Sequence, residues 1–422
     1  MSNQFSKEER VAFEDILEGF NDALVLSRNV SIFNTDSTTM ERTNNTLWRP
    51  MPYVARSWDG MDQTANFLNQ TQLSVPATIG FRRSSPWIMD ALELRDALQE
   101  RRLGDAARQK LASDVNVAVM NVAAAQGTLV VRRTGAATGF DDIAAADAMM
   151  NEIGVQMFDR TMALSSRDYM AMAGNLAARQ TVTGKVETAY ERAHVGVIAG
   201  FDTFKLDYAN RQLAAAGGAL TVNTQAGANH HVPIATRTAV TGEVGNVDNR
   251  TQTITVAIST ANVRAGDAFT IDGVNSVHLI TKADTGQRKT FRVIAVPSGT
   301  TLTISPPIIS NLSVGDAAAQ YQNCVVAGTG LATAAITWLN TAAAAINPFW
   351  QKDAIELLPG RYAVPSDAGA GVMRATTENG IELVMQKQYD IQTMRTRFRM
   401  DCAFGVVNKQ PEMTGIVLFG QT

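Results

Sequence analysis

The chain has 422 residues, of which 45% are hydrophobic and 18% charged, a composition that excludes a disordered or fibrous protein and allows roughly three domains. The formal net charge is −3 and the pI is near 5.9, and neither end of the chain is basic, which argues against a protein that grips nucleic acid by neutralising phosphates. Two cysteines are too few for a disulfide framework, and we expect neither a signal peptide nor a membrane-spanning segment, because the sequence has no apolar run of about eighteen residues.

Residues 7–28 have the pattern of an amphipathic helix. The residues near helical spacing on its apolar side are Val11, Ile16, Leu17, Phe20 and Leu24. Acidic residues, among them Glu14, Asp15 and Glu18, are interleaved with them. These form either an ordinary solvated face or a docking surface for a basic partner.

Residues 35–86 are rich in Thr, Asn, Gln, Pro and Gly. The prolines that argue against a helix are Pro50, Pro52, Pro76 and Pro86. We expect an extended arm or hairpin that reaches over a neighbouring molecule.

The strongest helical pattern runs from Asp90 to Gln126. Leucine, valine and alanine recur on a helical period, Arg101 and Asp105 are four residues apart, and Gly127 is placed to end the helix. Gly104 is a possible interruption. A helix of this length spans roughly 50 Å and needs a sheet or a neighbour along its side.

The second half of the chain changes character. Short helices and loops are expected over residues 141–215, and Thr and Val in alternating patterns over residues 220–310 predict an all-β module, a small barrel, with a hairpin turn at residues 297–300. We expect an alanine-rich helix over residues 332–346 and strands over residues 381–418. The pattern is an α+β host with an all-β insertion.

The sequence motifs that suggest an enzyme or a ligand site each lack a required residue or geometry. Residues 324–333 resemble a strand, a Gly-x-Gly turn and a helix, but Thr333 stands where a dinucleotide site has its third glycine, so a tight turn into a helix is the better interpretation. Gly184-Lys185 lacks the Ser or Thr of a phosphate loop, and the adjacent histidines His230 and His231 would point to opposite sides of an extended segment. We therefore expect no catalytic residues, no metal and no cofactor.

Arg395, Arg397 and Arg399 alternate along a predicted strand and would share one face. One interpretation is a solvated face of an edge strand, with Met394, Phe398 and Met400 packed inward. The other is a row of cations that meets acidic groups on a neighbouring subunit, or DNA phosphates. We favour the contact between subunits.

The chain resembles the coat proteins of short-tailed phages such as P22. The stretches that carry the resemblance are Asn45–Pro50, Leu94–Asp96, Ala106–Arg108, Ala199–Asp202, Asn246–Arg250, Phe349–Trp350, Asp353–Ile355 and Gly420–Gln421. No single stretch is diagnostic, but their order and spacing together are specific.

The resemblance implies a Hong-Kong-97-type phage capsid fold with a long spine helix, an extended loop, peripheral and central domains, and an inserted all-β barrel domain. It divides the chain into an N-terminal arm helix (1–35), an extended loop (36–86), the spine helix with part of the peripheral and central domains (87–219), the inserted barrel (220–325), and the remaining central and peripheral segments (326–422).

The function implied is that of a major capsid protein which self-assembles in the bacterial cytoplasm, with a scaffolding protein, into a procapsid and then the mature virion head. The partners implied are other copies of the chain, as hexamers and pentamers in a T=7 icosahedral shell, together with scaffolding protein, portal protein and double-stranded DNA held without sequence-specific contacts. Glu14, Asp15 and Glu18 would receive a basic scaffold segment. Glu243, Asp248 and Arg250 would lie in a loop that reaches a neighbouring capsomer.

Three alternatives remain from the sequence. An encapsulin-like shell would share the host fold but lack the β insertion, and a tail-tube protein would not need the long helix. An enzyme with a nucleotide-binding half around Gly328 and Gly330 has the weakest support.

Overall fold

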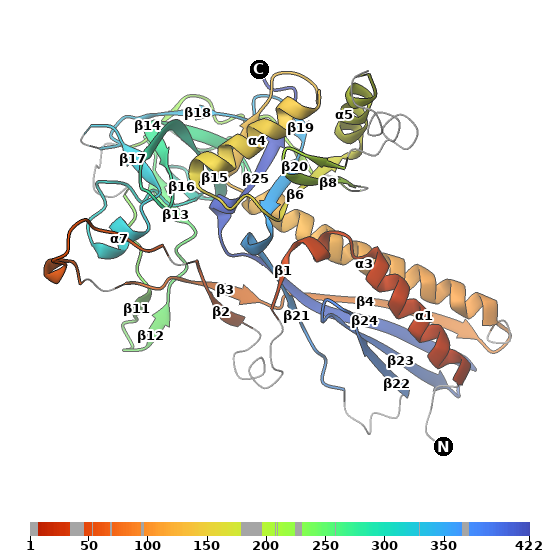
Figure 1. Cartoon of the computed structure of the whole chain (residues 1–422). Coiled ribbons are helices and arrows are strands. Elements are labelled where there is room, and N and C mark those ends of the chain that lie inside the picture. Colours follow the sequence, from red (N-terminus) through yellow and green to blue (C-terminus); the bar gives the residue numbers. More distant parts are fainter. Residues whose placement is uncertain are drawn as a thin grey trace. The chain divides into compact units, whose positions relative to one another are not determined.

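The computed structural model describes residues 7–33, 46–52, 54–67, 70–93, 97–178, 196–206, 208, 210–223, 230–257, 259–328, 330–364 and 371–422. The chain divides into two compact units. The first consists of Met1–Leu47, Pro76–Met120 and Ile355–Val407, and the second of Trp48–Val75, Asn121–Ala354 and Asn408–Thr422. Both contain helices and strands (Figure 1), which confirms the predicted α+β class.

The first unit is built on one sheet, in the order β1-β21-β24-β23-β22, with β4 also paired to β24. The strands are β1 (Ser31–Ile32), β4 (Phe81–Asp90), β21 (Ile355–Pro359), β22 (Gly371–Thr376), β23 (Glu382–Asp390) and β24 (Arg395–Asn408). Because β24 has β23 on one side and β4 on the other, it is an interior strand, so the alternative interpretation of the Arg395–Arg399 segment as an edge strand was wrong.

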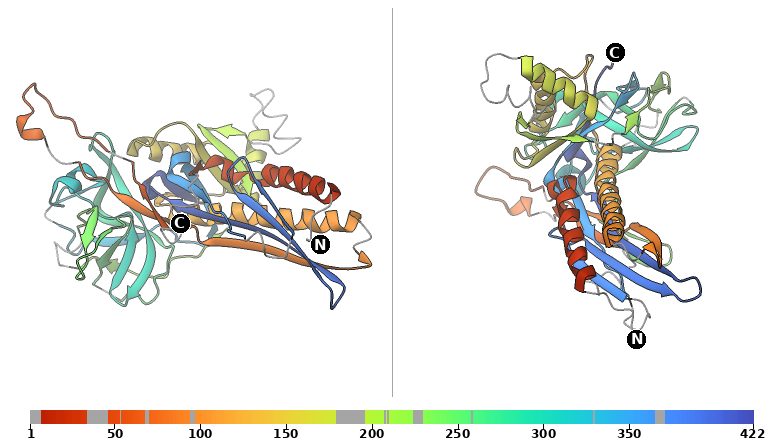
Figure 2. Two further views of the ribbon diagram at one scale, coloured as in Figure 1. Left: turned by 90° about the horizontal axis from the view of Figure 1, so that it is seen from below. Right: turned by 90° about the vertical axis from the view of Figure 1, so that its right-hand side faces the viewer.

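Two helices of the first unit pack on each other, α1 (Lys7–Ala23) and α3 (Ala97–Gln126), and run side by side along one face of the sheet (Figures 1 and 2). Their apolar contact faces include Ile16, Phe20 and Leu111, each at most 4% exposed. The side chain of Asn116 in α3 ends α1, because it donates to the Ala23 carbonyl at 2.9 Å and accepts from the Leu26 amide at 3.3 Å. A short 3-10 helix, η1 (Leu26–Asn29), follows.

Glycines allow this close helix packing. A side chain begun at Gly104 would meet Ile16 Cδ1 at 2.7 Å, and one at Gly19 would meet the Arg108 guanidinium at 1.9 Å. The helix therefore runs through Gly104 without interruption, since glycine is used there for contact and not for bending. Of the predicted apolar face, Val11 is exposed rather than packed.

The predicted start of the long helix at Asp90 was wrong. Asp90 is the last residue of β4, where it pairs with Arg395 of β24, and the first helical residue described is Ala97. Residues 94–96, which include the predicted helical Leu94, lie outside the described part of the chain. The ladder with β24 holds β4 extended as far as Asp90, so strand pairing overrides the predicted helix start there. Gly127 does follow the last turn, and its amide donates to the Ala123 carbonyl at 3.0 Å.

The second unit contains a β-barrel. Its strands are β10 (Leu220–Thr221), β13 (Gln252–Thr255), β14 (Ala268–Val277), β15 (Asp284–Ser298), β16 (Thr301–Ser305), β17 (Cys324–Val326) and β18 (Ala335–Trp338). They are ordered β10-β18-β14-β15-β16-β13, with β17 paired to β14, and a bridge between Val222 and Val256 joins the two ends. The predicted hairpin turn at residues 297–300 connects β15 to β16, and Ile254, Phe269 and Phe291 are among the fully buried side chains of its core.

The second unit also holds a mixed sheet in the order β5-β25-β20-β6-β8-β7. The strands are β5 (Leu129–Arg132), β6 (Arg160–Ser165), β7 (Val197–Ile198), β8 (Phe201–Leu206), β20 (Asn347–Gln351) and β25 (Thr414–Leu418), and the helices of this region are α4 (Phe140–Ile153) and α5 (Ser166–Ala178). The Asp142 carboxylate caps the start of α4, because it accepts from the amides of Thr138 and Gly139. The remaining short elements are β9 (Arg211–Gln212), which pairs with β19 (Ala344–Ala345), and the single-turn helices α7 (Asp316–Gln320), η4 (Lys352–Ala354) and η5 (Pro411–Met413).

The alanine-rich helix expected over residues 332–346 was wrong. Residues 335–338 form β18, which pairs with both β10 and β14, and Asn340 buries its side chain against the Ala268 amide and Asp267. Pairing with two neighbouring strands outweighs the helix propensity of alanine. The Gly-x-Gly turn thus leads into a strand, so a dinucleotide site would lack its helix N-terminus here.

The arm predicted for residues 35–86 contains the strand pair β2 (Thr46–Pro50) and β3 (Ser74–Thr78), and a short helix, η2 (Thr64–Asn66), near its far end (Figure 2). Pro50, Pro76 and Pro86 all lie in strands, as their extended preference predicted.

We predict that Gly104→Leu lowers the free energy of unfolding by about 1–3 kcal/mol, because the new side chain overpacks the contact with Ile16. Urea denaturation of the free subunit measures this. Gly174→Leu on α5 is the control, since nothing lies within 4 Å of a Cβ there, and helix propensity should stabilise it slightly. Equal midpoints for both variants would contradict the packing role.

Candidate assembly surfaces

The exposed face of α1 carries the predicted acidic group. Phe13, Ile16 and Phe20 are buried against the first unit, which leaves the side chains of Glu14, Asp15 and Glu18 exposed. Asp15 accepts from Arg101 at 3.2 Å, and both side chains are more than half exposed, so the pair is screened and contributes little stability. Neither Glu14 nor Glu18 has an ion pair among the described residues. The helix therefore presents a fixed row of carboxylates to solvent.

A separate contact fixes the end of α1 that bears this face. Lys387 of β23 forms an ion pair with Glu9, and both side chains are mostly buried. A partly buried pair holds its partners more firmly than an exposed pair does. The face is consequently part of a rigid surface in the first unit.

The second candidate surface is the hairpin of β11 (Thr236–Thr238) and β12 (Val244–Asn246), which projects from the second unit (Figure 1). Every residue of both strands is exposed, and Glu243 lies exposed in the turn that joins them. Gly242 adopts a positive φ of 88° to close that turn. A hairpin without buried side chains has no packing of its own, so its root must hold it in place.

The root of the hairpin is a polar clamp. The guanidinium of Arg250 donates from Nε and Nη2 to the Asp248 carboxylate, at 3.0 and 2.7 Å, and from Nη1 to the Asn408 carbonyl at 2.8 Å. The Asn249 side chain accepts from the Ile234 amide and donates to the Ile234 carbonyl, and its Oδ1 also accepts from His231 Nε2 at 3.2 Å. The structure thus brings Asp248 and Arg250 together and places Glu243 apart from them, at the tip.

The three arginines of β24 share one exposed face, as predicted. Each is paired within its own unit: Arg395 with Asp90 at 2.8 Å, Arg397 with Asp390 at 3.2 Å, and Arg399 with Asp401 at 2.7 Å. The opposite face buries Phe398 and Met400, but Met394 is exposed at the turn, so its predicted inward packing was wrong. Hydrogen bonds from Thr393 and the Gln392 amide hold the pKa of Asp390 below its ordinary value. The face is a row of matched charges and not a basic patch for phosphates.

Among the residues that the structure describes, no cluster of His, Cys, Asp and Glu is placed to hold a metal ion. No described helix is long and apolar enough to cross a membrane.

Comparison with known proteins identifies the family. The family described as P22 coat protein - gene protein 5 matches residues 1–420. The chain belongs to the P22 coat protein family. Its members are phage coat proteins, so this chain is a structural subunit of the icosahedral shell of a virion, and the capsid fold predicted from the resemblance is the fold of its family.

Several solved structures are similar to the chain. The CUS-3 coat protein I-domain is 45% identical, with 29% of this chain and 96% of that chain covered and a TM-score of 0.23. A chain from Mycobacterium phage Che8 is 10% identical, with 93% and 90% covered and a TM-score of 0.45. A chain from the satellite phage P4 procapsid including size determination (Sid) protein is 6% identical, with 96% and 90% covered and a TM-score of 0.39.

Sequence reasoning missed the buried cations of this P22 coat protein family member. Lys289 in β15 forms a buried ion pair with Glu412 and donates to the Asn323 carbonyl at 2.9 Å. Arg292, three residues on, is 1% exposed, and burial lowers its pKa to about 10 despite the opposing effect of Asp267. The sequence signal for these buried cations was the strand Lys-Thr-Phe-Arg-Val at residues 289–293. Its Lys and Arg stand at positions that apolar or solvent-exposed side chains ordinarily occupy in a barrel strand.

Histidines at the hairpin root are the other residues whose role the sequence did not show. His230 Nδ1 lies 2.8 Å from Ser310 Oγ, and His231 contacts Asn249, so both are partly buried and hydrogen-bonded instead of free on a turn. Burial lowers the pKa of each below the ordinary value of 6.5, and no charged group contributes to either shift. His194 lies outside the described residues.

We predict that acid loosens the hairpin root. The pKa of His231 is lowered in the folded state, so at a pH above its ordinary value of 6.5 the histidine is neutral in both the folded and the unfolded state and does not affect stability. As the pH falls below 6.5, the unfolded state binds a proton more readily than the folded state does, and the free energy of unfolding decreases. Hydrogen exchange of the Ile234 and Val247 amides should therefore accelerate beyond its intrinsic pH dependence as the pH falls below about 6.5. His231→Gln keeps a neutral donor for Asn249 and should weaken the acid response, and an identical response in both proteins would contradict the role of His231.

Proposed function

We propose that this coat protein assembles around an internal scaffolding protein whose basic segment binds the acidic face of α1. What supports the proposal is that Glu14, Asp15 and Glu18 stand on one rigid exposed helix face, of which only Asp15 has a cation of its own chain as partner among the described residues. A basic segment would add charge-assisted hydrogen bonds to carboxylates that are already held in place.

The β11–β12 hairpin would carry the contact with a neighbouring capsomer. Its exposed residues need a partner surface, and its clamp sets its direction before assembly. We place Glu243 at that contact and assign Asp248 and Arg250 to holding the hairpin. The row of Arg395, Arg397 and Arg399 would then meet a neighbouring subunit as paired ions. The domain boundaries predicted from the resemblance are part of this proposal.

Shell growth would rest on many weak contacts between identical subunits, in hexamers and pentamers of a T=7 lattice, with a portal protein at one vertex. Double-stranded DNA would be contained rather than gripped. The net charge of −3 and the pairing of the β24 arginines both leave the phosphates without a strong cationic surface.

We predict that reversing Glu14, Asp15 and Glu18 to lysine lowers scaffold incorporation at least tenfold and gives aberrant shells, because cations replace the acceptors of a basic segment. Electrophoresis of purified procapsids and electron microscopy measure this. The control reverses three other exposed acids, Asp141, Asp202 and Glu378. Normal scaffold content in the α1 variant would refute the docking site.

We predict different effects at the tip and the root of the hairpin. Asp248→Ala should lower the free energy of unfolding of the free subunit by up to about 3–5 kcal/mol, because Arg250 is mostly buried and loses its partner. The same variant should yield tubes, or shells with reduced heat resistance. Glu243→Arg should impair shells while leaving urea denaturation of the subunit unchanged. Heat-resistant, closed shells from Glu243→Arg would remove the tip from the contact.

A further inference from the structure

One lysine of the second unit turns inward from an exposed turn. Residues 278–283 join β14 to β15, and Ile280, Thr281 and Ala283 are exposed, Ile280 to 67%. Lys282 is instead half-buried and lines a cavity of about 250 Å³, which opens to solvent where the exposed Ile280 forms part of its wall. A turn ordinarily exposes its lysine and buries its isoleucine, so the arrangement here is reversed.

The backbone of the turn holds Lys282 in this position. Its φ is 59°, in the left-handed region that residues with a side chain rarely adopt. The Lys282 amide donates to the His278 carbonyl at 2.8 Å, and the His278 amide donates to the Ala283 carbonyl at 3.0 Å. The side chain donates from Nζ to the Gln322 carbonyl at 3.0 Å. Strained residues of this kind gather at functional positions, so the inward lysine calls for a chemical role.

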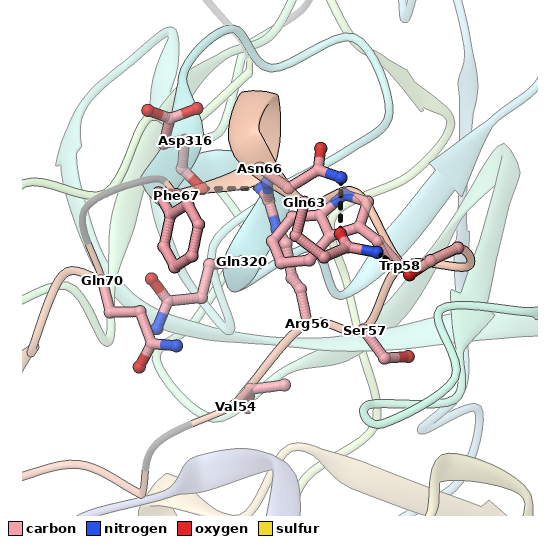
Figure 3. Close-up of a pocket in the computed structure, with 11 residues that line it drawn as sticks. Val54, Arg56, Ser57, Trp58, Gln63, Asn66, Phe67, Gln70, Asp316 and Gln320 are labelled. Carbon is pink, nitrogen blue, oxygen red and sulfur yellow. Dashed lines mark hydrogen bonds between the residues drawn. The ribbon is translucent and has the colours of Figure 1, made fainter.

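Lys282 is a partly buried cation without a counter-ion. It forms no ion pair with a described residue, because Glu412, the carboxylate that attracts it, is paired with Lys289. Arg56, which also repels it, is fixed by a hydrogen bond to the Asp316 carbonyl at 2.8 Å (Figure 3). Burial lowers the pKa of Lys282 to about 8, opposed by Glu412 and assisted by Arg56 and Lys289. A neutral amine in an apolar cavity is a nucleophile.

The lining indicates which electrophile fits. Its other charged groups have partners, since Arg250 is paired with Asp248 and Asp353 accepts from Gln351 Nε2 at 3.3 Å. Positive charge therefore exceeds negative charge around the amine, which favours an anionic leaving group. The remaining walls are mainly apolar and suit a short hydrocarbon chain, and they include Leu73, Leu279, Pro306, Ile309, Tyr321 and Met413.

We propose that Lys282 is a modification site at which a short-chain acyl phosphate acylates this chain. The Nζ lone pair attacks the acyl carbon and forms the N–C bond, while the C–O bond to phosphate breaks and the phosphate leaves with that electron pair. The proton that Nζ loses goes to the departing phosphate. The amide product is uncharged and keeps one N–H, for which the Gln322 carbonyl is the acceptor. Acylation thus removes an unpaired cation and leaves no donor unsatisfied.

Acetylation rates at individual lysines test the site. The free subunit is treated with isotopically labelled acetyl phosphate at about pH 7.5, and initial rates are measured by peptide mass spectrometry. About a quarter of an amine with a pKa of 8 is neutral at that pH, against about a thousandth at the ordinary 10.5, although nucleophilicity falls with the pKa. Lys282 should therefore react roughly tenfold faster than the exposed reference Lys205. An equal or lower rate at Lys282 overturns the proposal.

The pH profile separates this site from a lysine that is merely accessible. The rate at Lys282 should level off above about pH 8, where its amine is already neutral. A rate that still rises steeply up to about pH 10 contradicts the nucleophile that the reaction needs.

A second acetyl donor tests the leaving group. The N-hydroxysuccinimide ester of acetic acid transfers the same acetyl group but has no phosphate. The ratio of the rate at Lys282 to that at Lys205 should be higher with acetyl phosphate than with this ester, because the surrounding cations attract the phosphate. Equal ratios with the two donors would exclude an acyl phosphate as the preferred substrate class.

The consequence for the subunit is measured by placing the product in the chain. Nε-acetyl-lysine is incorporated at position 282 by amber suppression, and at position 205 as the matched control. Acetylation at 282 should raise the thermal unfolding midpoint at about pH 7, because the folded subunit no longer holds an unpaired cation, whereas acetylation of the exposed Lys205 should leave it unchanged. An unchanged or lower midpoint for position 282 shows that the cavity does not accommodate the acyl group, and overturns the assignment.

Discussion

The second unit depends on the buried polar contacts of strand β15. Lys289 pairs with Glu412, Thr290 exchanges hydrogen bonds with the backbone at Thr128 and Val130, and Arg292 reaches the Gly127 carbonyl at 3.4 Å. These contacts join the barrel to the mixed sheet through groups that are costly to bury and costlier to leave unpaired. Apolar packing alone would allow the two layers to slide, whereas paired charges fix one register. The geometry of the whole unit follows from that register.

The surface features of the unit can be traced to these contacts. The Asn323 carbonyl accepts from Lys289, while its side chain donates to the Pro307 carbonyl and accepts from the Ile309 amide. The next residue, Ser310, forms a hydrogen bond with His230 at the hairpin root. Asn323 also follows α7 closely, and α7 holds the arm. Hydrogen bonds therefore connect the hairpin root, through Asn323, to the buried Lys289.

Where local pattern and tertiary pairing agree, the fold follows from the sequence. The amphipathic spacing before Leu24 gave α1, and the Thr-Val alternation around Pro297-Ser298-Gly299-Thr300 gave a barrel hairpin, since the side chains of both also face a core. The helix predicted for residues 332–346 was wrong because alanine permits a helix but does not require one. The β18 segment instead forms hydrogen-bonded ladders with both β10 and β14. The predicted start of the long helix at Asp90 was wrong for the same reason, because Asp90 pairs with β24, a strand far away in the sequence.

The candidate sites divide in the same way. Exposure of the acidic residues on α1 and the shared face of the β24 arginines follow from period alone, because both are local properties of a helix and a strand. The partners of Arg395 and Arg397 do not, since only the sheet register brings Asp90 and Asp390 near them, whereas the partner of Arg399 is Asp401, two residues away on the same strand. The sequence marks Lys289 and Arg292 only as two cations in a predicted strand, because burial of a polar side chain is a property of the assembled interior.

The hairpin of β11 and β12 has a consequence for the geometry of a closed shell. An icosahedral lattice places one polypeptide in several surroundings whose local curvature differs, so a contact that required rigid jigsaw fit would satisfy only one of them. A two-stranded ribbon with no buried side chains bends at little free-energy cost, while its polar root keeps it aimed. The contact proposed for this hairpin would confine the bending to a few residues, and identical subunits would tile flat and curved regions alike without repacking their interiors.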